Sequence, residues 1–147
     1  MATRWRVEHR GRVLNQLFPE ADLDALSDQA AALDPGPPCY PLAGTGERFP
    51  FVAPEEAHGF LGDGPLSAAD PAEAFAAVAH GVAFIERLCY DLLDLAGADV
   101  TGTVALTGGA ARNPWWNQLR CDILGGPATL PTAARTRAGS GGAGGGQ

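Results

Sequence analysis

The chain has few of the residues that build disulfide scaffolds, metal sites and membrane spans. Its 147 residues include only three cysteines, and no two of them are spaced as C-x-x-C. Neither a disulfide framework nor a zinc site is therefore indicated. No apolar run is long enough to cross a bilayer, and no signal-peptide hydrophobic region follows the basic N-terminus. These absences favour a cytoplasmic protein.

An excess of basic residues is also missing. Ten Lys and Arg residues stand against seventeen Asp and Glu residues, which gives a net charge of −7. Because nucleic acids and anionic membranes attract positively charged proteins, neither is expected as a partner. Hydrophobic residues make up 46% of the chain, which is enough for a core and argues against general disorder. The length suits one domain.

The most informative segment combines a short strand, a glycine pair and a helix start. Residues 104–107 are apolar and β-branched, which predicts a strand buried on both faces. Gly108 and Gly109 lack a Cβ, so the backbone there can turn sharply and approach a ligand closely. Asn113 and Pro114 then supply an N-cap and a first helical residue. The segment predicts a strand that opens through a glycine turn into a helix.

Such a turn directs free backbone N–H groups and the positive end of the helix dipole at one point, where a phosphate would bind. Glycine pairs also occur in tight connections that bind nothing. The sequence contains neither G-x-G-x-x-G nor G-x-x-x-x-G-K-[ST], so neither a Rossmann fingerprint nor a P-loop is present. From the glycines alone a connection without a ligand is the more common case, so the residues by themselves suggest a nucleotide site without establishing one.

A long helix is predicted upstream of this segment. Asp70 and Pro71 form a helix start, and Gly97 ends the helix. Between them, apolar residues recur at steps of three and four, which indicates one buried stripe along the helix: Phe75, Val78, Val82, Ile85, Cys89, Leu92 and Ala96. In that position Cys89 is expected to be a buried small hydrophobic residue. The helix–strand–helix order predicts a layered α/β core.

Three further expectations concern the remaining segments. Leu23, Leu26, Ala30 and Leu33 predict a short amphipathic helix. Residues 34–70 are rich in proline and glycine, which predicts a long irregular segment with a short strand near residues 49–52. Trp115 and Trp116 face different ways on their helix, so one is expected in the core and the other partly exposed.

Three motifs resemble those of the FGGY carbohydrate kinases. The first, Leu106-Thr-Gly-Gly-Ala-Ala-Arg-Asn-Pro-Trp-Trp-Asn-Gln118 continuing to Gly125, resembles the family's C-terminal nucleotide motif. The second, Tyr40-Pro-Leu-Ala-Gly-Thr-Gly-Glu-Arg-Phe-Pro-Phe51 followed by Ala57-His-Gly-Phe60, resembles its Gly-Glu-Arg-x-Pro loop. The third, Ala79-His-Gly-Val-Ala-Phe84, resembles its Glu-Gly-Val-Ala-Phe segment. They occur in the family's order and cover roughly residues 10–130.

The resemblance implies a partial actin-like (ribonuclease-H-like) α/β ATPase domain, the C-terminal lobe of a sugar kinase. It implies ATP with Mg as the cofactor and a sugar hydroxyl as the phosphoryl acceptor. The implied nucleotide-binding residues are Gly108, Gly109, Ala110 and Asn113, with Asn113 near the adenine.

We expect the kinase domain to span residues 1–131 and a flexible glycine-rich tail to span residues 132–147. The family's sugar-binding domain and its catalytic aspartate have no counterpart here, so the chain is expected to be inactive alone. Two interpretations stay open: a kinase fragment that retains part of the nucleotide site, and a non-catalytic subunit that completes a kinase with a separate N-terminal-domain chain. An apolar face that would contact the missing domain is expected to be exposed.

Overall fold

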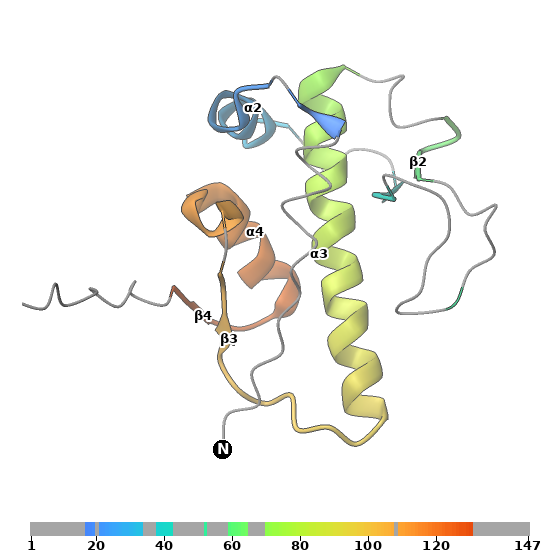
Figure 1. Cartoon of the computed structure of the whole chain (residues 1–147), viewed down its shortest axis with the longest axis vertical. Helices are drawn as coiled ribbons and strands as arrows, with labels where there is room; N and C mark the ends of the chain where they lie inside the picture. Colours follow the sequence, from blue (N-terminus) through green and yellow to red (C-terminus); the bar gives the residue numbers. More distant parts are fainter. Residues whose placement is uncertain are drawn as a thin grey trace, which may run out of the picture.

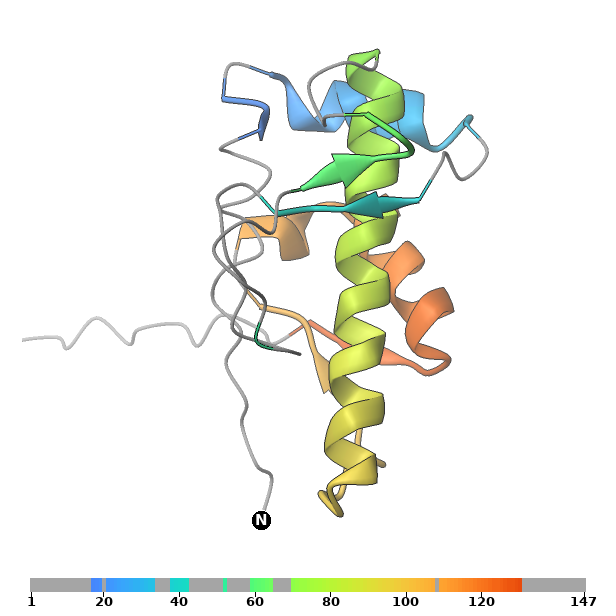
Figure 2. The same ribbon diagram turned by 90° about the vertical axis from the view of Figure 1, so that its right-hand side faces the viewer.

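One long helix, α3 (Pro71–Leu95), is the centre of the structure (Figure 1). The structure is a computed structural model, and it describes residues 17–19, 21–33, 38–42, 52, 59–64, 70–107 and 109–130. Figures 1 and 2 show helices α2 and α4 along one side of α3 and a small β-hairpin on another. The elements in chain order are α2 (Leu23–Ala30), β1 (Cys39–Tyr40), β2 (Phe60–Leu61), α3, β3 (Val104–Ala105), the 3-10 helix η2 (Gly109–Arg112), α4 (Pro114–Leu124) and β4 (Ala128–Thr129).

Both ends of α3 form as the sequence predicts. The Asp70 side chain accepts hydrogen bonds from the backbone N–H groups of Ala72 (2.9 Å) and Glu73 (3.4 Å), and so caps the free donors of the first turn. Pro71 takes the first helical position. At the other end, Gly97 has φ of +84°, a conformation that glycine adopts without a steric penalty. The predicted helix is confirmed to within one residue.

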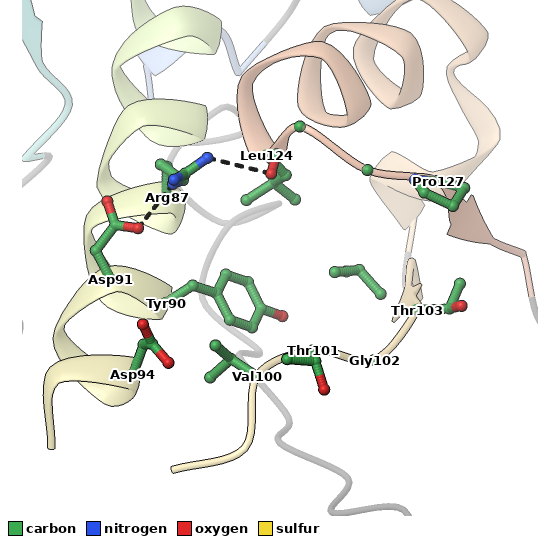
Figure 3. Close-up of a pocket in the computed structure, with 13 residues that line it drawn as sticks. Arg87, Tyr90, Asp91, Asp94, Val100, Thr101, Gly102, Thr103, Leu124 and Pro127 are labelled. Carbon is green, nitrogen blue, oxygen red and sulfur yellow. Dashed lines mark hydrogen bonds and ion pairs between the residues drawn. The ribbon is translucent and has the colours of Figure 1, made fainter. Parts of the chain in front are cut away.

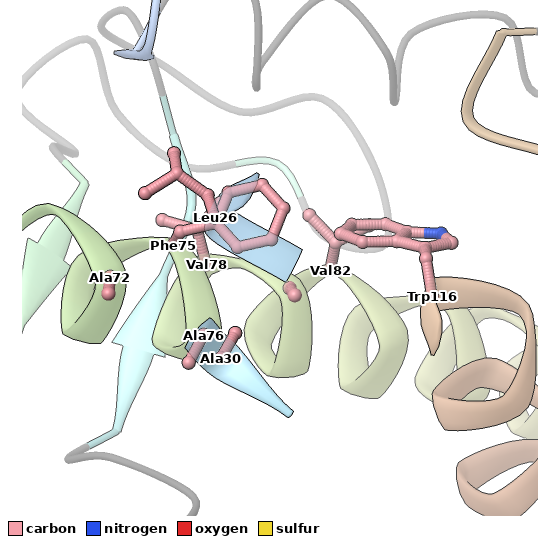
Figure 4. Close-up of a cluster of buried hydrophobic side chains, with 9 residues drawn as sticks. Leu26, Ala30, Ala72, Phe75, Ala76, Val78, Val82 and Trp116 are labelled. Carbon is pink, nitrogen blue, oxygen red and sulfur yellow. The ribbon is translucent and has the colours of Figure 1, made fainter. Parts of the chain in front are cut away.

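The main core lies where α2, the first half of α3 and α4 meet. Phe75, Val78 and Val82 from α3 pack with Leu26 from α2 and with Trp116 from α4 (Figure 4). The second core cluster joins the β-hairpin to the same helix through Leu61, Ala74 and Ala77. Since neighbours surround α3 on several sides, its small alanines are buried as well, and the fold is fixed around this half of the helix.

The predicted stripe along α3 is buried only in its first half. The buried residues of α3 run from Ala72 to Glu86 and none follows. Cys89 is half-buried rather than buried, and Ala96, which caps the helix, is exposed. The reason is that α2, the hairpin and the start of α4 all pack against the N-terminal half. The spacing of apolar residues shows which face of a helix is apolar, but it does not show how much of the length of the helix is covered by neighbouring elements.

Apolar side chains are exposed on the far half of α3, in line with the expected uncovered face. Phe84, Leu88 and Leu95 lie on one side of the helix by their spacing, with exposed fractions of 58%, 39% and 84%. We call these three residues the exposed α3 patch.

The two tryptophans behave as predicted. Trp116 is buried in the core, whereas Trp115 is half-buried. The ring of Trp115 lies 5.9 Å from that of Phe75, and the ring of Phe18 meets Phe75 edge-on at 5.7 Å. Both tryptophans thus pack with the aromatic core around Phe75.

The strand predicted over residues 104–107 is shorter and more exposed than expected. β3 covers two residues and pairs in parallel with β4, with Val104 opposite Ala128. Leu106 is buried, but Ala105 and Thr107 are exposed. Burial on both faces was therefore wrong. A parallel strand is buried on both faces only when layers cover the sheet on each side, and this two-stranded ladder supplies too little surface for that.

Two other predicted elements need correction. The predicted helix over Leu23, Leu26, Ala30 and Leu33 is α2, which ends at Ala30, so Leu33 lies beyond it and is exposed. In the described part of residues 34–70 the strands are β1 and β2, paired antiparallel with Cys39 opposite Leu61, and the sequence did not indicate them. Of the strand predicted near residues 49–52, only Val52 is described, and it lies in no strand. The rest of that prediction falls outside the described residues.

Gly81 allows α3 to touch β1, which yields a first prediction. A Cβ at this position would lie 2.5 Å from the Cys39 carbonyl oxygen and 3.0 Å from the Cδ atom of Pro41. Glycine to alanine inside a helix ordinarily stabilises by about 1 kcal/mol. Here we expect Gly81→Ala to lower the free energy of unfolding by about 1–3 kcal/mol, because the β1 backbone must move away.

Urea unfolding followed by circular dichroism measures this effect. Gly126→Ala is the matched control, because a Cβ at Gly126 meets no atom within 4 Å. An unchanged or raised midpoint for Gly81→Ala would show that α3 and β1 are not in close contact.

Candidate functional site

The predicted nucleotide-binding residues fall in the connection between β3 and α4. Gly109 and Ala110 form the first half of η2, and Asn113 precedes the first residue of α4. Gly108 lies outside the described residues. The glycine pair does not lead directly into the helix as predicted, because a 3-10 turn intervenes. The turn places Asn113 at the N-terminus of α4, where backbone N–H groups and the helix dipole favour an anion.

Asn113 is held at both ends of its amide. Its backbone is extended, with φ −90° and ψ 111°, and its Oδ1 accepts a hydrogen bond from Trp116 N at 2.9 Å. This confirms the predicted N-cap. The Nδ2 group donates to the Oγ of Ser27, a residue 86 positions earlier in the chain. The N-terminus of α4 is thereby fixed to α2.

Asn117 closes the turn from the other side. Its Nδ2 donates to the carbonyl oxygen of Ala111 at 2.9 Å, which ties the first turn of α4 back onto η2. Its Oδ1 is buried and accepts no hydrogen bond from the described residues. Backbone and side-chain bonds together thus determine the shape of the connection.

A buried ion pair fixes α4 to α3 behind this turn. Arg120 donates from Nε and Nη2 to the two carboxylate oxygens of Glu86, at 2.7 and 2.6 Å. Glu86 is 3% exposed and Arg120 is 8% exposed. The two parallel bonds form the bidentate geometry in which arginine and carboxylate interact most strongly. The pair therefore fixes the register of the helix that carries the candidate site.

The described residues also line a cavity of about 440 Å³ at the other end of β3 (Figure 3). One wall is the second half of α3, where Arg87 donates to Asp91 at 2.8 Å and to the carbonyl oxygen of Leu124 at 3.3 Å. Tyr90 extends into it, and Thr103 lies across from it. In open α/β sheets ligands bind outside the carboxyl ends of the strands. This cavity lies at the amino end of β3, so it is separate from the η2–α4 turn.

Metal-binding groups and reactive thiols are not part of the turn. Among the described residues, no three His, Cys, Asp or Glu side chains are close enough together to hold a metal ion. Cys39, Cys89 and Cys121 form no disulfide bond with one another. Burial raises the pKa of Cys39 to about 11, so this thiol stays protonated at neutral pH.

None of the helices in the described part of the chain is both long enough and apolar enough to cross a membrane.

Comparison with known protein families supports the resemblance seen in the motifs. The described structure combines helices with two small two-stranded sheets, and the sequence matches a family model over residues 3–144. That model describes the C-terminal domain of the FGGY family of carbohydrate kinases. The chain belongs to this family, and it represents the C-terminal lobe of a sugar kinase.

Sequence reasoning missed the polar residues that support the turn. Ser27 gave no signal, because its partner Asn113 is distant in the sequence. Glu86 and Arg120 did carry a signal in their spacing. Glu86 lies four positions after the buried Val82, and Arg120 lies four positions after the buried Trp116. A charged residue on the buried face of a helix requires a partner of opposite charge.

Proposed function

We propose that this chain is the nucleotide-binding portion of an ATP-dependent carbohydrate kinase, with the site in the turn from Gly108 to Asn113. The backbone of Gly109 would lie against the nucleotide phosphates and Asn113 near the adenine, with Ala110 between them on the same turn. The observation that carries the proposal is the state of the Asn113 amide. An asparagine side chain has two N–H donors and two acceptor lone pairs, and only one of each is used in the hydrogen bonds to Ser27 and Trp116.

The residues of the turn fit a nucleotide and leave the magnesium ion unassigned. The positive end of the helix dipole at the start of α4 favours phosphate oxygens, and an amide with one free donor and one free acceptor can pair with the edge of a purine. No described side chain is assigned to Mg²⁺, which would be bound through the phosphates of ATP.

The lobe is proposed to belong to an actin-like, ribonuclease-H-like fold that closes against a second domain. In the full-length family that other domain binds the sugar and supplies the aspartate that acts as base. ATP supplies the γ-phosphoryl group. This chain's residues would orient the nucleotide, which is one part of the positioning on which phosphoryl transfer depends. We therefore expect nucleotide binding without sugar phosphorylation from this chain alone.

The exposed α3 patch favours a second candidate function. Phe84, Leu88 and Leu95 form an exposed apolar surface, and such surfaces often mark contacts between proteins. Under this alternative the chain is a subunit that completes a kinase with a separate chain carrying the N-terminal domain. Adding such a chain would restore sugar phosphorylation, whereas a fragment that has no such partner stays inactive.

Titration of Mg-ATP and ADP into the purified chain, by calorimetry and thermal shift, tests the proposed function. Saturable heat and a rise in Tm that follows nucleotide concentration would support it. A cooperatively folded chain that gives neither signal would refute it.

Variants at Asn113 separate nucleotide contact from helix capping. Asn113→Ala removes both and is expected to cost about 1 kcal/mol of stability through the lost cap, together with a several-fold weaker nucleotide affinity. Asn113→Ser retains a good cap but no amide, so its stability should stay close to that of the wild type while its affinity falls. Calorimetry and urea unfolding on the same samples measure both quantities. Wild-type affinity in Asn113→Ser would remove Asn113 from the site.

A further inference from the structure

Ser27 is a buried polar residue within a helix, far in sequence from the turn that it contacts. It is 4% exposed. Its Oγ donates to the carbonyl oxygen of Leu23 at 2.6 Å, one helical turn earlier, which is the usual bond of a serine in mid-helix. Because that bond uses the only hydroxyl hydrogen, the oxygen can act toward other groups only as an acceptor. It accepts from Nδ2 of Asn113.

This bond determines which way round the Asn113 amide lies. A side-chain amide can rotate by half a turn and exchange its oxygen and nitrogen. Trp116 N requires an acceptor at 2.9 Å, and the Ser27 oxygen requires a donor. Only one orientation satisfies both. The two helices therefore set the amide plane from opposite sides, and among the described contacts one N–H and one lone pair of the amide stay uncommitted.

We propose that Ser27 is a positioning residue for nucleotide recognition: its hydroxyl orients the Asn113 amide so that the free N–H and the free lone pair are presented to the base. The inference rests on the proposed nucleotide-binding function of the η2–α4 turn. Ser27 itself touches no ligand. Without its oxygen, Nδ2 of Asn113 loses its protein partner, and the amide samples other orientations before the base binds. Affinity then falls because only a fraction of the molecules is competent to bind.

The test combines nucleotide affinity with a direct view of the amide. Ser27→Ala removes the acceptor, and Ser27→Thr retains the hydroxyl. Asp22→Ala is the matched control for stability: Asp22 caps the same helix through Asp24 N and Ala25 N and is not bonded to Asn113 in the described contacts. Binding of ADP to the full chain is measured by calorimetry. The ¹⁵N–¹H signals of the Asn113 side chain are recorded without nucleotide.

We expect Ser27→Ala to shift the Asn113 side-chain signals and to weaken ADP binding about three- to tenfold, the size of one lost hydrogen bond. Ser27→Thr should restore most of the affinity, and Asp22→Ala should leave both the signals and the affinity close to the wild type. Unmoved Asn113 signals in Ser27→Ala would overturn the inference. An equal loss of affinity in Asp22→Ala would do the same, since it would show an effect of stability alone.

The proposed function and the role of Ser27 are refuted by different results. A folded wild-type chain that binds no ADP would refute the proposed function, and the inference with it. Wild-type binding that Ser27→Ala leaves unchanged would refute the inference and leave the proposed function standing.

Discussion

Glu86→Gln is expected to lower the free energy of unfolding by about 3–5 kcal/mol, the usual cost of removing one partner of a buried ion pair. Glutamine has nearly the shape of glutamate, so little packing is lost. The guanidinium of Arg120, 8% exposed, would then stay buried between α3 and α4 without an opposite charge. Since small domains are stable by about 5–15 kcal/mol, this single change removes a large part of the total. Urea unfolding followed by circular dichroism measures it.

Two further variants show whether the effect arises from the unpaired charge. The double substitution Glu86→Met with Arg120→Met removes both charges, and we expect it to recover most of the stability that either single change loses. The side chains of Arg87 and Asp91 form an ion pair and are each about half exposed. Asp91→Asn breaks this exposed pair and should change the free energy of unfolding by less than about 1 kcal/mol. A Glu86→Gln chain as stable as Asp91→Asn would contradict the buried pair.

Phe75→Ala is expected to cost about 3–5 kcal/mol, because it leaves a cavity at the centre of the core. Phe75 is 1% exposed and contacts the rings of Phe18 and Trp115. The same helix offers a matched control. Phe84 is 58% exposed, so Phe84→Ala removes the same atoms mostly from water and should cost less than about 1 kcal/mol.

Thermal and urea unfolding of both phenylalanine variants test this contrast. Similar losses at the two positions would mean that the far half of α3 is covered in solution, for example by a second chain. A small loss at Phe75 would mean that the core is not assembled as described.

Local chemistry was enough to predict α3 and the start of α4. An aspartate cap, a proline at the first position and a glycine at the end delimit α3, and the Asn113 cap with Pro114 delimits the start of α4. These signals act within one turn of the chain, so they can be read without knowing the fold. The different burial of Trp115 and Trp116 also follows from helix geometry alone.

The strands were predicted poorly because a strand depends on its partner. β1 and β2 cover two residues each and are separated by about twenty residues of chain, so no periodicity records them. β3 was predicted correctly in place but not in burial, since burial depends on the layers that cover a sheet.

By itself, the sequence determined the positions of the long helices, the glycine and asparagine turn, and the family to which the chain belongs, because these depend on residues close together in the chain. Only the tertiary structure decided which half of α3 is buried, how Glu86 and Arg120 pair, and how Ser27 holds Asn113. Each of these depends on contacts between segments that are 34 to 86 residues apart. Such contacts form only when the helices pack, because burial in the packed core is what makes a precise polar partner necessary.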